Sequence, residues 1–136
     1  MIQGKNNDQI KPFYLVKNKR MSFDFPDVSD SLKNPNGLLA IGGDLSEKKL
    51  LSAYKKGIFP WFNEGQPILW WSPDPRCILK PNEIHISHSL KKRIRKKQFK
   101  ITFNQAFINV INECSINRDN NDTWLTKDMK IAFTQL

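Results

Sequence analysis

Residues 57–76 read Gly-Ile-Phe-Pro-Trp-Phe-Asn-Glu-Gly-Gln-Pro-Ile-Leu-Trp-Trp-Ser-Pro-Asp-Pro-Arg, and the rest of the chain is organised around this stretch. It contains three of the four tryptophans, two phenylalanines, four prolines and two glycines. So many prolines disfavour a helix or a central strand, and we expect a rigid, aromatic-lined surface. Neighbouring side chains of a strand point to opposite faces. If residues 68–71 are extended, Trp70 and Trp71 therefore cannot both enter one core, and one of them is expected to cover a second surface.

The chain has 136 residues, 39% of them hydrophobic, which is enough for a domain that buries roughly two-thirds of its unfolded surface. Cys77 and Cys114 lie far apart in the sequence and form no paired metal spacing. This usage is typical of a reducing compartment and of small buried side chains. His85 and His88 lack a nearby ligand set, so no metal site is predicted.

Residues 1–11 are polar, and no apolar run approaches the length that spans a membrane. The sequence therefore predicts neither a signal peptide nor contact with a membrane interior, and the expected location is cytoplasmic.

The net charge of +9 is concentrated in the second part of the chain. Residues 1–75 hold 10 Lys and Arg against 8 Asp and Glu, whereas residues 76–136 hold 12 against 5. The densest cluster lies within ten residues and comprises Lys91, Lys92, Arg93, Arg95, Lys96, Lys97 and Lys100. Such a cluster indicates a polyanionic partner or an anionic surface.

Before the aromatic stretch, residues 13–16 form a short apolar run that is a candidate edge strand. Ser46 is a plausible N-cap for a helix that continues to Lys56 and is ended by Gly57. Leu50, Leu51 and Tyr54 recur at helical spacing and are expected to face the core. For Tyr54, spacing alone favours a core aromatic residue.

After the aromatic stretch, residues 77–80, 83–87 and 99–103 have the composition of strands. Ser87 or Ser89 can cap the basic helix between them, on which Leu90 and Ile94 form a narrow apolar stripe. The basic side chains of this helix could simply be a solvated charged face. We favour phosphate contact, because like charges on one helix repel each other unless a polyanion is near.

Two further helices are predicted towards Leu136. In the first, Asn104 is the expected cap and the apolar positions place the helix in the core; they are Phe107, Val110, Ile111 and Cys114. In the second, Thr126 is the expected cap and one face carries Met129, Ala132, Phe133 and Leu136. No Gly, Asn or Pro follows this apolar stripe, and from that pattern we expect a domain interrupted before its core is complete.

Several long strings of this sequence, spread over residues 23–136, carry a family resemblance. They comprise the run 34–45, Tyr54, the runs 57–62 and 68–76, His85-Ile86-Ser87, the run 103–107 and Thr123-Trp124-Leu125-Thr126. In this order they resemble the leucyl/phenylalanyl-tRNA–protein transferase family. The length and composition of these strings make a chance match improbable.

The resemblance implies an aminoacyltransferase of the bacterial N-end rule pathway. Such enzymes transfer Leu or Phe from aminoacyl-tRNA to the N-terminal Lys or Arg of acceptor proteins, marking them for degradation, without a cofactor. It also implies an α+β fold, with a small N-terminal α/β domain at residues 1–75. An incomplete acetyltransferase-like (GNAT) domain is expected at residues 76–136.

The resemblance assigns site residues by position in this sequence. Trp61 and Trp124 match tryptophans that hold the terminal adenosine of the tRNA, and Tyr54 matches a tyrosine near that pocket. A base–aromatic stack is worth about 1–3 kcal/mol for any base, which suits recognition of the 3′ end common to different tRNAs. Candidates for tRNA phosphate binding on the basic helix are Lys91, Lys92, Arg95 and Lys96. His88 stands where the family leads us to expect arginine, so one phosphate contact here is expected to be weaker or pH-dependent.

The family's catalytic carboxylate and glutamine are expected beyond Leu136, so impaired transfer is expected of these 136 residues. A non-catalytic RNA-binding remnant is an alternative, and so is a generic basic domain whose aromatic residues all lie in the core.

Overall fold

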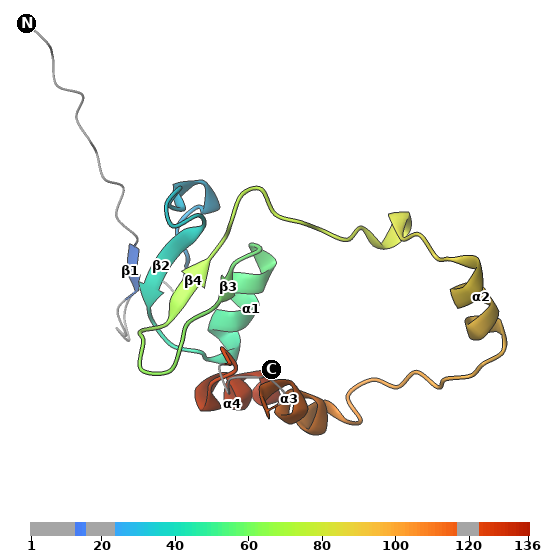
Figure 1. The fold of residues 1–136 in the computed structure, drawn as a ribbon. Helices are drawn as coiled ribbons and strands as arrows, with labels where there is room; N and C mark the ends of the chain where they lie inside the picture. Colours follow the sequence, from blue (N-terminus) through green and yellow to red (C-terminus); the bar gives the residue numbers. More distant parts are fainter. Residues whose placement is uncertain (1–12, 16–23, 117–122) are drawn as a thin grey trace, which may run out of the picture.

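A computed structural model describes residues 13–15, 24–116 and 123–136 of the chain. Its centre is a four-stranded sheet in the order β1–β2–β4–β3 (Figure 1). The strands are β1 (Phe13–Leu15), β2 (Leu38–Gly42), β3 (Phe59–Pro60) and β4 (Leu69–Trp71). β1 is parallel to β2, whereas β4 is antiparallel to both β2 and β3. The predicted edge strand is therefore confirmed over Phe13–Leu15, and position 16 lies outside the described residues.

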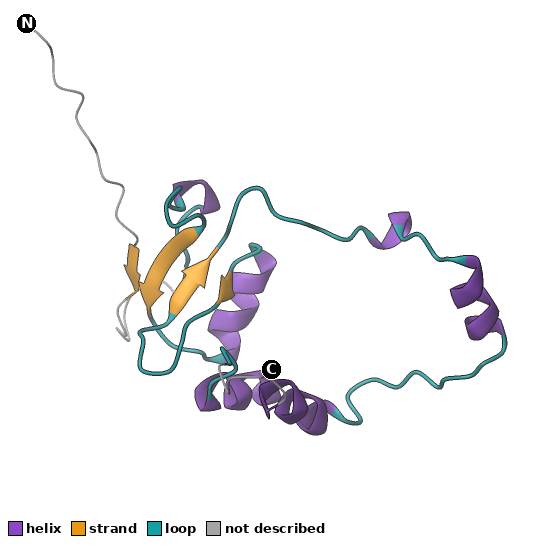
Figure 2. Ribbon diagram, viewed as in Figure 1, coloured by secondary structure: helices purple, strands orange, loops and turns teal. Residues whose placement is uncertain are grey.

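The helices complete an α+β arrangement, as predicted (Figure 2). They are α1 (Glu47–Lys55), α2 (His88–Arg95), α3 (Phe107–Ile116) and α4 (Lys127–Gln135), with short 3-10 turns at Val28–Asp30 and Pro81–Glu83. α3 and α4 pack against each other near one end of α1. In the described part of the chain, each helix is too short or too polar to cross a membrane.

Trp70 is the largest fully buried side chain of the described core. Its ring meets the ring of Phe25 edge-on, with 4.8 Å between centroids, and its indole Nε1 donates a 2.9 Å hydrogen bond to the carbonyl oxygen of Gly42. The indole thus buries its apolar surface without leaving its one donor unsatisfied. Trp71 next to it is only half-buried, which confirms that the two tryptophans face different surfaces.

α1 packs on this core through Leu50 and Ala53, both fully buried. Gly57 ends the helix as predicted: its φ is +73°, the left-handed conformation that favours glycine, and its N–H donates to the carbonyl of Tyr54. The expectation that Leu51 and Tyr54 also face the core is wrong, because they are 42% and 41% exposed. The buried face of α1 follows positions 49, 50 and 53, which turns positions 51 and 54 outwards.

Lys49 is the charged side chain that this face of α1 buries. Its ammonium lies 4.3 Å from the centre of the Phe25 ring, a cation–π contact. Burial lowers the pKa of Lys49, and the nearby carboxylates of Asp44 and Asp24 act in the opposite direction.

Residues 77–106 form an arm that leaves the sheet after β4, carries α2 at its outer end and returns to α3 (Figure 1). Every residue of this arm is exposed, including Phe103 at 85%. The strands predicted at 77–80, 83–87 and 99–103 are wrong, because these residues pair with no strand in the described part of the chain. A strand is stable only when a neighbour satisfies its backbone groups and a second layer covers its apolar side chains.

The predictions for α3 are also corrected in part. Only Ile111 and Ser115 of this helix are buried, whereas Phe107 and Val110 are exposed at 42% and 57%. The helix begins at Phe107, and Asn104 has a positive φ of 54°, so Asn104 is not its cap. Both cysteines are exposed, contrary to the expectation of small buried residues. Thr126 caps α4 as predicted, its side chain accepting a hydrogen bond from the N–H of Met129.

The close approach of Gly37 to Pro73 gives a test of this fold. Gly37 has a φ of +88°, and a Cβ atom there would lie 2.4 Å from both Cα and N of Pro73. Gly37→Ala is expected to lower the free energy of unfolding by about 3 kcal/mol or more, because backbone strain adds to overlap. Gly65→Ala is the matched control: φ is +77° but no atom lies within 4 Å of the added Cβ, so a loss of only about 1–2 kcal/mol is expected. Equal losses in urea unfolding would contradict the packing described.

Candidate nucleic-acid interface

Trp61 presents an exposed indole ring on a backbone that is held at both ends of the residue. Its N–H donates a 2.9 Å hydrogen bond to the carbonyl of Leu69, and its own carbonyl accepts a 2.7 Å hydrogen bond from Nε1 of Trp71. The Trp61 side chain is 54% exposed, and its ring lies 6.4 Å from the ring of Trp71 at a tilt of 57°. An accessible aromatic face on a fixed backbone is suited to stacking on a planar ligand such as a nucleobase.

Arg76 places a positive charge beside the segment that leads to Trp61. Its guanidinium donates a 2.5 Å hydrogen bond to the carbonyl of Gly57 and lies 4.9 Å from the centre of the Phe59 ring. The residue ties the end of α1 to the chain that follows β4. Because guanidinium groups also bind phosphate, a cation here suits an anionic ligand lying near Trp61.

Tyr54 lies on the outward face of α1, the helix that contacts β3. Partial burial raises the pKa of its hydroxyl above the ordinary value of 10.0. The hydroxyl is protonated near neutral pH, as in an ordinary tyrosine, and is available as a hydrogen-bond donor.

Trp124 lies at the entrance to α4, where its ring meets the ring of Phe133 edge-on at 6.2 Å. It forms part of an apolar groove of about 510 Å³ between α3 and α4. The groove is lined by Phe107, Val110, Ile111, Cys114, Trp124, Leu125, Phe133 and Leu136. Trp124 is half-buried, so part of its ring is accessible from this groove.

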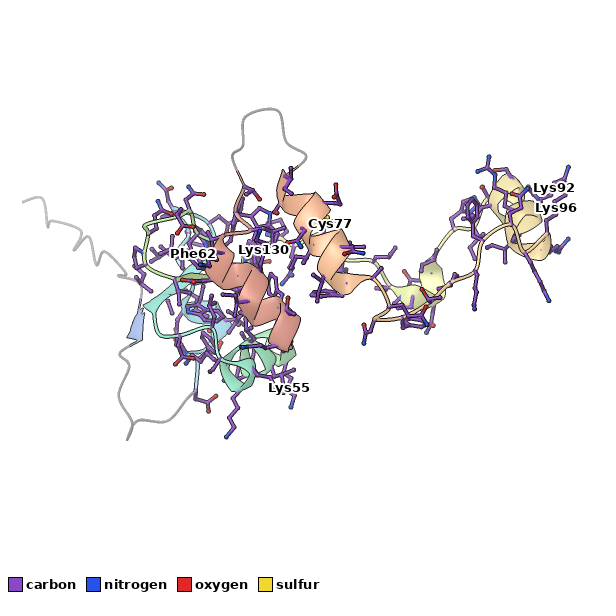
Figure 3. The ribbon with its side chains drawn as sticks, turned by 90° about the horizontal axis from the view of Figure 1, so that it is seen from below. Lys55, Phe62, Cys77, Lys92, Lys96 and Lys130 are labelled. Atoms are coloured by element: carbon purple, nitrogen blue, oxygen red, sulfur yellow. The ribbon has the colours of Figure 1, made fainter. Side chains whose placement is uncertain are left out.

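α2 carries its basic side chains on a fully exposed helix. The side chain of Ser87 caps it by accepting a hydrogen bond from the N–H of Leu90, which confirms one of the two predicted caps. Lys92, Arg93 and Arg95 lie in its last turn, where positive charge is favourable to the helix dipole. Figure 3 shows Lys92 and Lys96 projecting from α2 into solvent. The ion pairs of Lys56 with Asp24 and of Lys80 with Glu83 do not involve α2.

The predicted site residues thus lie on three separate parts of the molecule. Trp61 and Tyr54 belong to the sheet and α1, Trp124 to the groove at α4, and the α2 cations to the outer end of the arm (Figures 1 and 3). Among the described residues, the ring contact of Trp61 is with Trp71 and that of Trp124 is with Phe133. A ligand that touches α2 as well as the two tryptophans must be extended, because α2 lies at the outer end of the arm.

Two family models match the chain. Residues 43–74 match the leucyl/phenylalanyl-tRNA protein transferase N-terminal domain, and residues 78–136 match the leucyl/phenylalanyl-tRNA protein transferase model. A curated leucyl/phenylalanyl-tRNA–protein transferase of Pseudomonas syringae pv. syringae is 53% identical over 118 residues, which cover 86% of this chain and 52% of the relative. One from Psychromonas ingrahamii is 54% identical over 113 residues, covering 82% of this chain and 48% of the relative. The chain spans about half the length of the curated relatives it matches.

Sequence reasoning did not find Trp71 and Arg76 as neighbours of the site. Both act through hydrogen bonds to backbone carbonyl groups, of Trp61 and Gly57 respectively, and backbone acceptors leave no mark in the sequence. The sequence feature that could have indicated Trp71 is its position next to Trp70 in a strand, because neighbouring strand residues face opposite sides.

The raised pKa of Tyr54 predicts how this part of the molecule responds to alkali. The folded pKa lies above the unfolded value, so the contribution of Tyr54 to stability is complete below that value and is lost as the pH rises through the folded pKa. Titration of phenolate absorbance, compared between the wild type and Tyr54→Phe, should give a difference curve with its midpoint above pH 10. A midpoint at or below this value would show that the hydroxyl is not desolvated.

Proposed function

The chain belongs to the leucyl/phenylalanyl-tRNA–protein transferase family, and on that basis we propose that it binds the 3′ end of aminoacyl-tRNA for transfer of an amino acid to a protein. The proposed substrates are Leu-tRNA and Phe-tRNA, and the proposed acceptors are proteins with N-terminal Lys or Arg. The location proposed for this activity is the cytoplasm, in the N-end rule pathway. Residues 1–75 are proposed as the family's N-terminal domain, and residues 76–136 as part of its GNAT-like catalytic domain.

The reaction proposed is aminolysis of the ester that joins the amino acid to tRNA. The neutral α-amine of the acceptor attacks the ester carbonyl carbon, an amide bond forms, and the ester C–O bond breaks. The terminal ribose oxygen of the tRNA leaves with the proton. Because the ester is already activated, most of the rate enhancement can come from holding amine and carbonyl in contact.

The observation that carries this proposal is the exposed ring of Trp61 on a backbone fixed by Leu69 and Trp71. Stacking needs only the flat face of a base and no particular sequence around it, so one platform serves every tRNA that ends in adenosine. Trp124 and Tyr54 are proposed to complete the adenosine site. Arg76 is proposed to supply positive charge near the terminal phosphates.

The exposed cations of α2 support a second contact, with tRNA phosphates. Lys91, Lys92, Arg95 and Lys96 are proposed to make it. Such contacts increase affinity for any sequence and weaken with salt, because binding releases counterions. Recognition of the end of the tRNA and attraction to its backbone are thus assigned to different parts of the chain.

The groups that orient the acceptor amine are proposed to belong to the half of the relatives that this chain does not match. A transfer assay with Phe-tRNA and a peptide beginning with Arg separates this from a role in RNA binding alone. Transfer by the 136 residues at the rate of a full-length relative would contradict the assignment of those groups to the unmatched half.

Trp61→Ala should remove the preference of the chain for RNA that ends in adenosine. The test compares binding of deacylated tRNA with and without its 3′-terminal adenosine, at one salt concentration. Loss of the stack is expected to weaken binding of the intact tRNA about five- to 150-fold and to leave the shortened tRNA unaffected. Leu79→Ala, which truncates an apolar side chain that is 75% exposed on the arm, is the matched control. Unchanged preference in Trp61→Ala would overturn the proposed site.

Removing the positive charges of α2 should weaken RNA binding without changing the preference for RNA that ends in adenosine. In the variant with Lys91→Gln, Lys92→Gln, Arg95→Gln and Lys96→Gln, both RNAs should bind more weakly by the same factor. The slope of log affinity against log salt should fall by about 3 in magnitude if all four cations contact phosphate. Lys33→Gln with Lys48→Gln, two exposed lysines near the sheet, is the control. A slope that falls equally in both variants would show that α2 is no special phosphate site.

A further inference from the structure

Trp61 lies just beyond the end of β3, and its N–H still donates a 2.9 Å hydrogen bond to the carbonyl of Leu69 in β4. β3 contains only Phe59 and Pro60, which pair with Trp71 and Trp70 of β4. After Trp61 the chain enters a turn in which the N–H of Gln66 donates to the carbonyl of Asn63. The carbonyl of Trp61 accepts its hydrogen bond from a side chain and not from the backbone of a strand.

That partner is Trp71, and its bond is well formed. Nε1 of Trp71 lies 2.7 Å from the Trp61 carbonyl oxygen, and the two rings lie 6.4 Å apart at a tilt of 57°. The distance is at the short end of the range for N–H donors. Trp71 thus touches both the backbone and the ring of Trp61 while its own ring stays partly exposed.

We propose that Trp71 is a positioning residue for the nucleobase platform, holding the Trp61 carbonyl through its indole N–H so that the Trp61 ring keeps one exposed face. This inference rests on the proposed function, because it assigns Trp61 to base stacking. A platform held in one orientation before binding loses less conformational entropy when the base arrives. Trp71 acts through Trp61 and is not assigned a contact with the base.

A purely structural role is the competing explanation, and the neighbouring tryptophan provides the contrast. Trp70 is fully buried, and its indole N–H donates to the carbonyl of Gly42 inside the sheet. Replacing Trp70 would therefore lower the stability of the fold. The indole N–H of Trp71 bonds instead at the exposed end of the hairpin. A residue that positions Trp61 should change end recognition by more than it changes stability.

Trp71→Phe is the test, because it keeps an aromatic ring and removes the N–H donor. We expect the preference for tRNA ending in adenosine to fall about three- to tenfold. A change of this size corresponds to the free energy of the single hydrogen bond that orients Trp61. Binding of tRNA that lacks the terminal adenosine should be unchanged. In the Trp61→Ala background, Trp71→Phe should have no further effect on the preference, since the two residues act as one unit.

Indole N–H signals in NMR spectra of the free chain give a readout that is independent of RNA. Trp71→Phe should shift the Trp61 signal, whereas Trp124→Phe, a matched ring exchange beside Phe133, should leave it in place.

An unmoved Trp61 signal in Trp71→Phe overturns the proposal. So does an unchanged end preference, or an effect of equal size in the Trp61→Ala background, which would mean direct contact of Trp71 with the base. If Trp61→Ala itself leaves the end preference intact, the proposed function fails first and this inference falls with it.

Discussion

Burial of Trp70 is the constraint on which the rest of this structure depends. Its ring is sealed among β2, α1 and Phe25, and its N–H is satisfied by Gly42. Because neighbouring strand residues face opposite sides, sealing Trp70 turns Trp71 to the outer surface. There Trp71 bonds the carbonyl of Trp61. Two adjacent tryptophans thereby connect the core of the domain to the surface on which a nucleobase is proposed to stack.

The two kinds of contact proposed for RNA lie on different parts of the molecule. The aromatic platform belongs to a hairpin supported by the sheet, whereas the densest positive charge lies on α2 at the end of the arm. Stacking and phosphate contact are both indifferent to base sequence. We propose that a chain combining them binds an extended RNA by its backbone and recognises only its final base. This division agrees with membership of a family whose name contains both tRNA and protein.

Local signals in the sequence were sufficient for much of the fold. The cap at Ser87, the stop at Gly57, the cap at Thr126 and the opposite facing of Trp70 and Trp71 are all decided by near neighbours. The strands predicted along the arm failed because a strand needs a pairing partner, which a local pattern does not report. The exposure of Tyr54 could not be predicted, because it depends on which face of α1 meets the sheet. The contacts of Trp71 and Arg76 with backbone carbonyls could not be predicted either, because they form only when the chain segments have been brought together in the fold.

The proposed function depends on direct contact between the terminal adenosine of the tRNA and Trp61. Photo-crosslinking with tRNA that carries 8-azidoadenosine as its last nucleotide, followed by peptide mapping, measures this contact directly. We predict that the label is recovered on the peptide containing Trp61 and is lost when unlabelled tRNA with an intact 3′ end competes. Label recovered only on α2 or spread along the arm, and competed equally by tRNA without its terminal adenosine, would contradict the central claim.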